Sequence, residues 1–475
     1  MFDDARKRWW ALYVLCSGVL MIVLDTTIVN VALPSIRTDL KFTETTLVWV
    51  VNAYMLTYGG FLLLGGRLGD LFGHRKLFLI GLVLFTTASL ACGLSNSQSM
   101  LIAARAIQGL GGAVVTAVAL SLIMDLFQET GDRAKAMGIY GFVCSAGGSI
   151  GVLLGGLLTT TLSWHWIFLV NLPLGFAAYF ACLRLLPRDG ARKGDVKLDI
   201  GGAVTVTSSL MLAVYAIVHG QEMGWTSPQT LGLLGTAVLL LIAFIVIESR
   251  VKAPLMPLGL FKLRNVATAN TVGVLWAAAM FAWFFISALY LQLVLGYNAL
   301  MVGLSFLPSN LIMAVFSLGL SAKIVMKFGF RKPLAFGLLL AAAGLAWFAR
   351  APVDGNFWID VLPGMLLLGI GAGIAFNPVL LGAMSEVQPS ESGLASGMVN
   401  TAFMMGGSLG LAILASLAAA KTTDALAVDA SQAVALNAGY HLAFTLGAIA
   451  AALAAIIGAV FMRTKMTAGA APPAH

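Results

Sequence analysis

The amino-acid sequence predicts an all-α membrane protein with fourteen transmembrane helices and both termini in the cytoplasm. Of its 475 residues, 60% are hydrophobic and 10% are charged, which leaves too few charges to cover a water-soluble globule of this length. The apolar residues gather in fourteen long runs, and the Lys and Arg residues that separate the runs alternate between a basic side and a nearly neutral side. These observations define the fold class.

Each apolar run reaches the length of about 20 residues that crosses about 30 Å of hydrocarbon as a helix. Charged residues or turn-forming residues separate successive runs, so each run ends where the chain can leave the bilayer. In chain order, the predicted helices are 10–34, 46–71, 76–96, 98–127, 133–161, 165–187, 198–219, 229–250, 266–292, 300–327, 331–350, 358–387, 391–419 and 439–462.

The basic residues indicate which side of the membrane each connection faces. An even number of crossings puts both termini on one side, and Arg6, Lys7 and Arg8 precede the first run. Of the 28 Lys and Arg residues, Arg105 lies inside a run and nearly all others fall on the side of the termini. The exceptions are Arg37, Lys41, Arg350 and Lys421. The positive-inside rule therefore predicts cytoplasmic termini, and the net charge of +8 lies beside anionic lipid.

Two basic, polar stretches, 184–199 and 248–265, divide the predicted helices into three groups. We expect an N-terminal six-helix bundle at 1–190, a two-helix insert with cytoplasmic linkers at 191–260, and a C-terminal six-helix bundle at 261–475. A weak repeat supports this division, because GHRK after the second helix recurs as GFRK after the tenth. Two six-helix bundles related by a pseudo-twofold axis along the membrane normal are typical of secondary transporters.

Three motifs carry a resemblance to a known family. They are LDTTIVNVALP in the first predicted helix, GRLGDLFGHRK after the second, and RAIQG in the fourth. They resemble the signature motifs of the major facilitator superfamily, and with fourteen helices the chain is similar to its drug:proton antiporter branch of the QacA/EmrB type. The resemblance covers essentially the whole chain. One departure is that Val152 follows Gly151 in the fifth helix, where these antiporters usually have Gly-Pro.

Asp25 is the carboxylate that the predicted helices place well inside the membrane. An ionised acid at mid-bilayer costs about 2.5–3.5 kcal/mol on insertion scales, so such residues usually face a cavity and carry function. At ~1.5 Å per residue, Arg105 and Asp25 lie about 10 and about 14 Å from the outer ends of their helices, so they can pair. We expect Asp25 to carry the proton and Arg105 to control its release. A permanent salt bridge between two helices is the alternative.

Arg67, Asp70 and Arg75 occupy the short connection after the second predicted helix. Neighbouring glycines permit a tight turn there, and the charges can bridge helices and helix ends when the cytoplasmic side is closed. We therefore expect these three residues to act as a gate and not to contact the substrate. Glycines at every fourth position of the fifth helix, 147, 151 and 155, predict close packing of another helix on that face.

A candidate substrate-binding surface combines aromatic, thioether and amide side chains. Methionines and aromatic faces suit diverse lipophilic ligands and can hold cations, while amide and hydroxyl groups can orient them. Core packing and hydrogen bonds between helices explain the same residues as an alternative. The candidates are Asn52, Tyr54, Gln108, Trp276, Met280, Trp283, Phe284, Gln292, Asn377, Asn400, Met404 and Met405.

Other classes of protein lack their motifs in this sequence. It has no phosphate-binding Gly-rich loop with a Lys, no GxSxG and no HExxH, which argues against an ATP-driven pump and against hydrolases. The four cysteines lie singly in four predicted helices, far from metal-ligand spacing, so no metal and no cofactor are expected. No basic cluster with interleaved aromatics predicts nucleic-acid binding.

The sequence thus predicts a proton-coupled secondary active exporter of lipophilic or cationic small molecules in the bacterial cytoplasmic (inner) membrane, and not an enzyme. It would work by alternating access between the two bundles. A lipid or metabolite exporter or flippase on the same scaffold is the alternative. The expected partners are small-molecule substrates, protons and the lipid bilayer, and a periplasmic adaptor is a further possibility.

Overall fold

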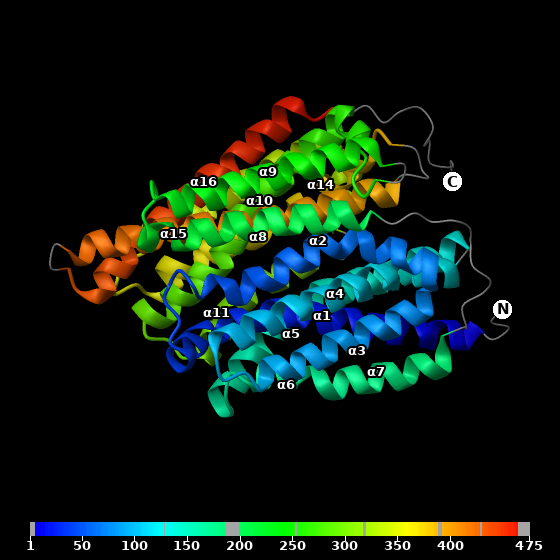
Figure 1. Ribbon diagram of the computed structural model, residues 1–475, viewed down its shortest axis with the longest axis horizontal. Coiled ribbons are helices and arrows are strands. Elements are labelled where there is room, and N and C mark those ends of the chain that lie inside the picture. Colours follow the sequence, from blue (N-terminus) through cyan, green and yellow to red (C-terminus); the bar gives the residue numbers. More distant parts are fainter. Residues whose placement is uncertain are drawn as a thin grey trace.

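The computed structural model describes residues 5–127, 129–186, 199–251, 254–316, 320–387, 392–427 and 430–463. In these residues the regular secondary structure is helical, and most helices run side by side along one direction (Figure 1). The helix α1 begins and α16 ends at the same end of the molecule. We call this the terminal end and the opposite one the far end.

The first half of the chain contains seven helices, and the two-helix insert follows it. Their bounds are α1 Ala5–Leu40, α2 Val48–Phe72, α3 His74–Gly93, α4 Gln98–Leu126, α5 Thr130–Thr161, α6 Trp166–Leu169, α7 Asn171–Leu185, α8 Ile200–Met223 and α9 Pro228–Arg250. Polar side chains fix several helix starts, because Ser97 and Ser227 accept backbone N–H groups three residues further on.

The second half begins with a short 3₁₀ helix and continues with seven α-helices. Their bounds are Leu258–Lys262 (3₁₀), α10 Arg264–Leu289, α11 Ala299–Val315, α12 Ser321–Phe328, α13 Arg331–Phe348, α14 Leu362–Met384, α15 Ser392–Leu426 and α16 Gln432–Phe461. Single π-helical segments, Tyr290–Val294 and Phe357–Val361, extend α10 and precede α14.

Thirteen of the described helices are long and apolar enough to cross a membrane. They match thirteen of the predicted runs, with α6 and α7 together forming one span. The remaining run, 300–327, corresponds to α11, which has 17 residues, and to α12. Residues 317–319 between them lie outside the described residues. The fourteenth span and the cytoplasmic position of the termini stay predictions.

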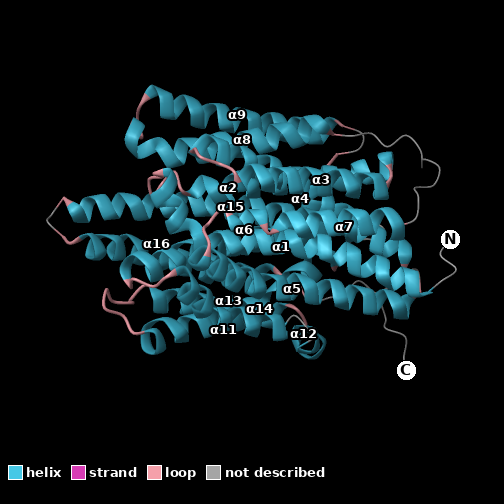
Figure 2. Ribbon diagram, turned by 90° about the horizontal axis from the view of Figure 1, so that it is seen from below, coloured by secondary structure: helices cyan, strands magenta, loops and turns pink. Residues whose placement is uncertain are grey.

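The helices pack as two halves with the insert beside them (Figures 1 and 2). In the first half α4 packs on α2 and α3, while α1 packs on α5 and α7. In the second half α10 packs on α15 and α16, and α13 packs on α14 and α16. The halves meet along two seams, α2 with α15 and α5 with α11. The insert hairpin of α8 and α9 places α8 against both α2 and α15. The domain limits at 190 and 260 stay predictions.

Glycines let the helix backbones approach closely, as predicted for the fifth transmembrane helix. A Cβ atom added at Gly155 of α5 would lie 2.6 Å from the Ile28 carbonyl oxygen of α1. At Gly156, one residue further on, it would lie 2.6 Å from the Ala299 carbonyl oxygen of α11. The helix α5 therefore packs tightly on its own half through one face and on the other half through the next.

Candidate proton-coupling site

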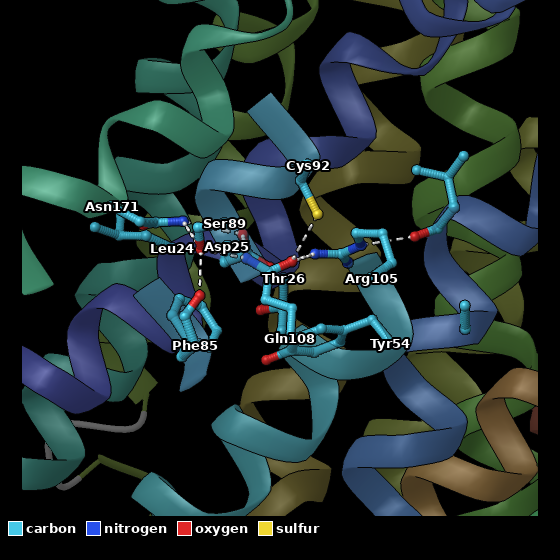
Figure 3. Close-up of polar contacts among 12 residues, drawn as sticks. Leu24, Asp25, Thr26, Tyr54, Phe85, Ser89, Cys92, Arg105, Gln108 and Asn171 are labelled. Atoms are coloured by element: carbon cyan, nitrogen blue, oxygen red, sulfur yellow. Dashed lines mark hydrogen bonds and ion pairs between the residues drawn. The ribbon is translucent and has the colours of Figure 1, made fainter. Parts of the chain in front are cut away.

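A buried polar network surrounds Asp25 in the middle of the first half (Figure 3). Its carboxylate Oδ2 accepts a hydrogen bond from Arg105 Nη1 of α4 at 2.5 Å. The other oxygen, Oδ1, accepts from Gln108 Nε2 at 2.7 Å and from Asn171 Nδ2 of α7 at 3.1 Å. Ser89 of α3 accepts from the same two amide groups at 2.8 and 3.4 Å. Four helices thus position one carboxylate.

Neutral groups also hold the guanidinium of Arg105. Its Nε donates to the Val50 carbonyl oxygen of α2 at 2.8 Å, and its Nη1 donates to Gln108 Oε1 at 2.7 Å. The ring of Tyr54 lies 4.4 Å from the guanidinium carbon and that of Phe168 lies 5.6 Å from it, which are cation–π distances. Arg105 therefore has partners that it can keep when it separates from Asp25.

The pair is fully removed from solvent, since Asp25 is 0% and Arg105 is 1% exposed. Burying two charges is expensive, and their attraction offsets that cost only when the remaining hydrogen-bonding groups are satisfied. Here Asp25 accepts three hydrogen bonds and Arg105 has both the carboxylate and neutral partners. In such a site, the carboxylate can exchange the guanidinium, its positive partner, for a proton.

The contact between Asp25 and Arg105 is the pairing that their predicted depths in the membrane allowed. Gln108, a substrate-binding candidate, is part of this network, and its Oε1 lies 3.7 Å from Cys92 Sγ. Its role in substrate binding stays a prediction. Asn171 and Ser89 were missed by the sequence analysis. Asn171 could have been noticed as an amide inside an apolar run, whereas a single serine such as Ser89 gives little signal.

Two of the amide candidates connect the halves. Asn52 Nδ2 of α2 donates to the Ser408 carbonyl oxygen of α15 at 3.0 Å. Gln292 Nε2, just after α10, donates to the Val31 carbonyl oxygen of α1 at 2.9 Å. Both therefore make the interhelical hydrogen bonds that were the alternative interpretation. Asn52 Oδ1 is buried without a hydrogen-bond partner.

The aromatic candidates separate into two places. Trp276 of α10 and Asn400 of α15 line one small apolar hollow between α10, α14 and α15. Trp283 and Phe284 instead pack on Phe306, with ring centroids 5.6 and 5.5 Å away, and form part of the core of the second half. The indole N–H groups of both tryptophans are buried without a hydrogen-bond acceptor.

The other binding candidates are distributed over several helices. Tyr54 lies beneath the guanidinium described above, and its hydroxyl is buried without a partner. Met404 of α15 lies against Gly59 of α2, so it belongs to the α2–α15 seam, with Met405 beside it. Met280 on α10 and Asn377 on α14 are half-buried. No single pocket of the described residues gathers all the candidates, and their role in substrate binding stays a prediction.

The predicted gate residues lie at the terminal end of the first half. Arg75 Nη2 donates to the Leu183 carbonyl oxygen near the end of α7 at 2.7 Å, so it does bridge a helix end. His74 Nδ1 lies 3.0 Å from Asp125 Oδ2, which joins α3 to α4. Arg67 is half-buried on α2, and the side chain of Asp70 lies outside the described residues. Gating by these residues stays a prediction.

Groups of three or more His, Cys, Asp or Glu side chains that could hold a metal ion do not occur in the described part of the chain. Its four cysteines are free thiols.

Comparison with known proteins gives a consistent result. A family profile described as Major Facilitator Superfamily matches residues 15–411. The puromycin resistance protein pur8 of Streptomyces alboniger is 40% identical over 89% of this chain and 84% of its own length. The cephamycin export protein CmcT of Amycolatopsis lactamdurans is 39% identical over 89% of this chain and 87% of its own.

Solved structures show the same fold at low sequence identity. The crystal structure of the POT family transporter PepTSo has a TM-score of 0.68 at 17% identity and covers 97% of this chain and 98% of its own. The xylose transporter XylE from E. coli, in an inward open conformation, has a TM-score of 0.63 at 16% identity, covering 97% of each chain. The chain therefore belongs to the major facilitator superfamily and is a membrane transporter rather than an enzyme.

Proposed function

We propose that this transporter is a proton-coupled antiporter that exports lipophilic or cationic small molecules by alternating access. The observation that carries the proposal is the dehydrated contact between Asp25 and Arg105, two ionisable side chains from different helices in the middle of the first half. Ionisable groups at such depth are costly and are commonly found in proton pathways.

The coupling works through competition for one carboxylate. When α1 and α4 separate, Asp25 loses the guanidinium, and an unpaired carboxylate in low-dielectric surroundings costs several kcal/mol. A proton on Asp25 removes that charge. Arg105 meanwhile keeps the Val50 carbonyl, Gln108 Oε1 and the Tyr54 ring. Proton binding and separation of the pair are therefore thermodynamically linked, so each favours the other.

The names of the relatives support export of antibiotics or similar compounds. They describe puromycin resistance, cephamycin export and, for the Stp protein of Mycobacterium tuberculosis, multidrug resistance. We infer from them and from the aromatic and methionine side chains on α10 and α15 that the substrates are amphipathic. The proposed location is the bacterial cytoplasmic membrane, with both chain termini in the cytoplasm as the basic connections predict.

Purified protein in proteoliposomes tests the proposal. With a pH-sensitive dye inside and an outward-directed substrate gradient, an antiporter moves protons against the direction of the substrate. The Asp25→Asn variant should lose this proton signal, while Asp424→Asn, the same change at an exposed position near the end of α15, should keep it. Substrate flux without proton movement in the wild type would refute antiport. Movement of labelled lipid but of no small molecule would favour the flippase alternative.

A further inference from the structure

Two carboxyl side chains are buried together at the terminal end of the insert, far along the chain from Asp25. Asp199 precedes α8 as its N-cap residue and is 4% exposed, while Glu248 lies in the last turn of α9 and is 3% exposed. Asp199 Oδ1 accepts the Gly202 backbone N–H at 2.7 Å. Glu248 Oε2 accepts the Met256 backbone N–H at 3.1 Å.

The second oxygen of each carboxyl group faces the other acid. Asp199 Oδ2 and Glu248 Oε1 are buried and have no N–H or hydroxyl partner. Both approach the same glycine, because a Cβ atom at Gly202 would lie 2.6 Å from the first and 2.8 Å from the second. The two free oxygens therefore lie close together, and a proton on either acid would let it donate a hydrogen bond to the other. A hydrogen bond between two carboxyl groups requires a proton on one of them, since two carboxylates only accept and repel.

The helix termini indicate which acid holds that proton. Asp199 caps the N-terminus of α8, where the helix dipole and the Gly202 N–H favour a negative charge. Glu248 lies at the C-terminal end of α9, where the dipole disfavours one. These helix termini therefore favour a proton on Glu248.

Three basic residues lie on the described elements that surround this site. The helices packed there carry Arg67 on α2 and Arg250 on α9, and Lys262 ends the nearby 3₁₀ helix. None of them forms a salt bridge with either acid in the described part of the chain. The charged groups on the far halves of α8 and α15 are Glu222, Lys421 and Asp424.

The acid pair adjoins the contact between the insert and α2. Ala203, next to Gly202, packs with Leu64 of α2 and with Leu255, the neighbour of Met256, in one small apolar cluster. Further along, a Cβ atom at Gly60 of α2 would overlap the Thr207 hydroxyl of α8, so these two helices are in close contact. The carboxyl pair thus joins α8, α9 and the following segment at the point where they meet a helix of the α2–α15 seam.

We propose that Asp199 and Glu248 form a second proton-binding site, which holds one proton and fastens the base of the insert against α2. Loss of the proton leaves two buried carboxylates facing each other, and their repulsion loosens the start of α8 and the segment after α9. Because the pair lies at the terminal end, it exchanges its proton with the solution on that side. It therefore responds to pH there and adds nothing to the number of protons carried across. The site exists whether or not Asp25 couples transport.

Infrared spectroscopy of the purified full-length protein in nanodiscs tests this directly, without transport. A protonated carboxyl group gives a C=O stretching band that disappears on ionisation. The wild type should show such a band and lose it as the pH rises, Glu248→Gln should remove it, and Asp199→Asn should shift its titration to lower pH. Asp25→Asn and Glu222→Gln, an exposed acid at the other end of α8, should leave it in place. A band unchanged in Glu248→Gln overturns the proposal.

A second measurement follows the docking of the insert. After correction for the intrinsic pH dependence of exchange, amide hydrogen exchange at 200–207 should accelerate in the wild type over the pH range in which the carboxyl band is lost. Glu248→Gln keeps the shape, and its amide N–H can donate to Asp199 at every pH, so residues 200–207 should stay protected in this variant. The folded core of α4 should stay protected in both proteins. Equal pH responses in the two proteins overturn the proposal. Loss of the carboxyl band on adding Na⁺ or Mg²⁺ at constant pH also overturns it, because the pair would then be a metal site.

Discussion

Replacing Asp25 with asparagine removes the negative charge of this side chain and keeps its shape. The substitution leaves the Arg105 guanidinium, 1% exposed, without a counter-charge. The amide nitrogen of asparagine also replaces one of the two carboxylate oxygens, and it cannot accept a hydrogen bond. Either the hydrogen bonds from Gln108 and Asn171 to Oδ1 or the hydrogen bond from Arg105 to Oδ2 is therefore lost. Removing one partner of a buried ion pair costs about 3–5 kcal/mol. We expect Asp25→Asn to remain folded and inserted, with stability reduced by about this amount, and to lose uphill, proton-coupled transport completely.

The double variant Asp25→Asn/Arg105→Gln tests the origin of that cost. Because it removes both charges, it should recover most of the lost stability and still fail to transport uphill. Thermal unfolding of the purified proteins measures the first effect, and substrate uptake driven by a pH gradient in inside-out vesicles measures the second. Ligand binding can persist in both variants. Uphill transport by Asp25→Asn at the wild-type rate would remove Asp25 from the mechanism, and equal stability of the single and double variants would contradict the described pairing.

Four further predictions concern the same membrane core and its far end. Arg105→Ala should move the pH optimum of transport upward, because the carboxylate then holds its proton without competition; an unchanged pH profile would instead support a permanent structural salt bridge. With one carrier acid, export of a monocation in exchange for one proton moves no net charge. It should therefore respond to the pH gradient and not to voltage, whereas a neutral substrate should gain about 2.3 kcal/mol per 100 mV. Efficient voltage-driven export of a monocation, or a preference for dications, would reveal a further coupled proton site. Gly155→Ala, whose Cβ would lie 2.6 Å from a backbone oxygen of α1, should cost about 1–3 kcal/mol in thermal stability, while Gly148→Ala, with its nearest neighbour 3.9 Å away, should be nearly neutral. Burial raises the pKa of the Glu44 carboxyl, against the opposing effect of the nearby Arg37 guanidinium. Because this pKa is higher in the folded than in the unfolded protein, the wild type should gain thermal stability relative to Glu44→Gln as the pH falls toward 4.5, and parallel pH curves would contradict that sign.

The positions of the membrane-spanning helices were largely predictable, because crossing hydrocarbon demands long apolar runs. The ends of these helices were less predictable. The first run was ended at Pro34, yet α1 continues to Leu40, since a proline inside a membrane helix is tolerated when neighbouring groups satisfy the backbone. The helix α15 likewise ends at Leu426, after its apolar run has ended at 419, and α16 begins at Gln432, before its apolar run starts at 439. Hydropathy marks the part of a helix that lies in lipid and not the helix itself.

The candidate site was predictable only in its charged members. Asp25 and Arg105 are conspicuous because a charge inside an apolar run is rare, and their depths follow from counting residues. The rotation of each helix about its axis cannot be obtained by counting residues, because a run that is apolar on every side gives no indication of which face is buried. For this reason Asn171 and Ser89 were missed, and the packing of Trp283 on Phe306 could not be predicted.

The insert makes the two seams of the transporter unequal. The helix α8 lies against α2 and α15, where Thr207 meets Gly60 and Ser416 Oγ donates to the Ile217 carbonyl oxygen at 3.3 Å. The α5–α11 seam has no comparable cover among the described helices. A lipophilic molecule dissolved in the bilayer thus meets one seam directly and the other only after passing around a helical hairpin. Lateral access from the lipid to the interface between the halves therefore differs between the two sides of the molecule.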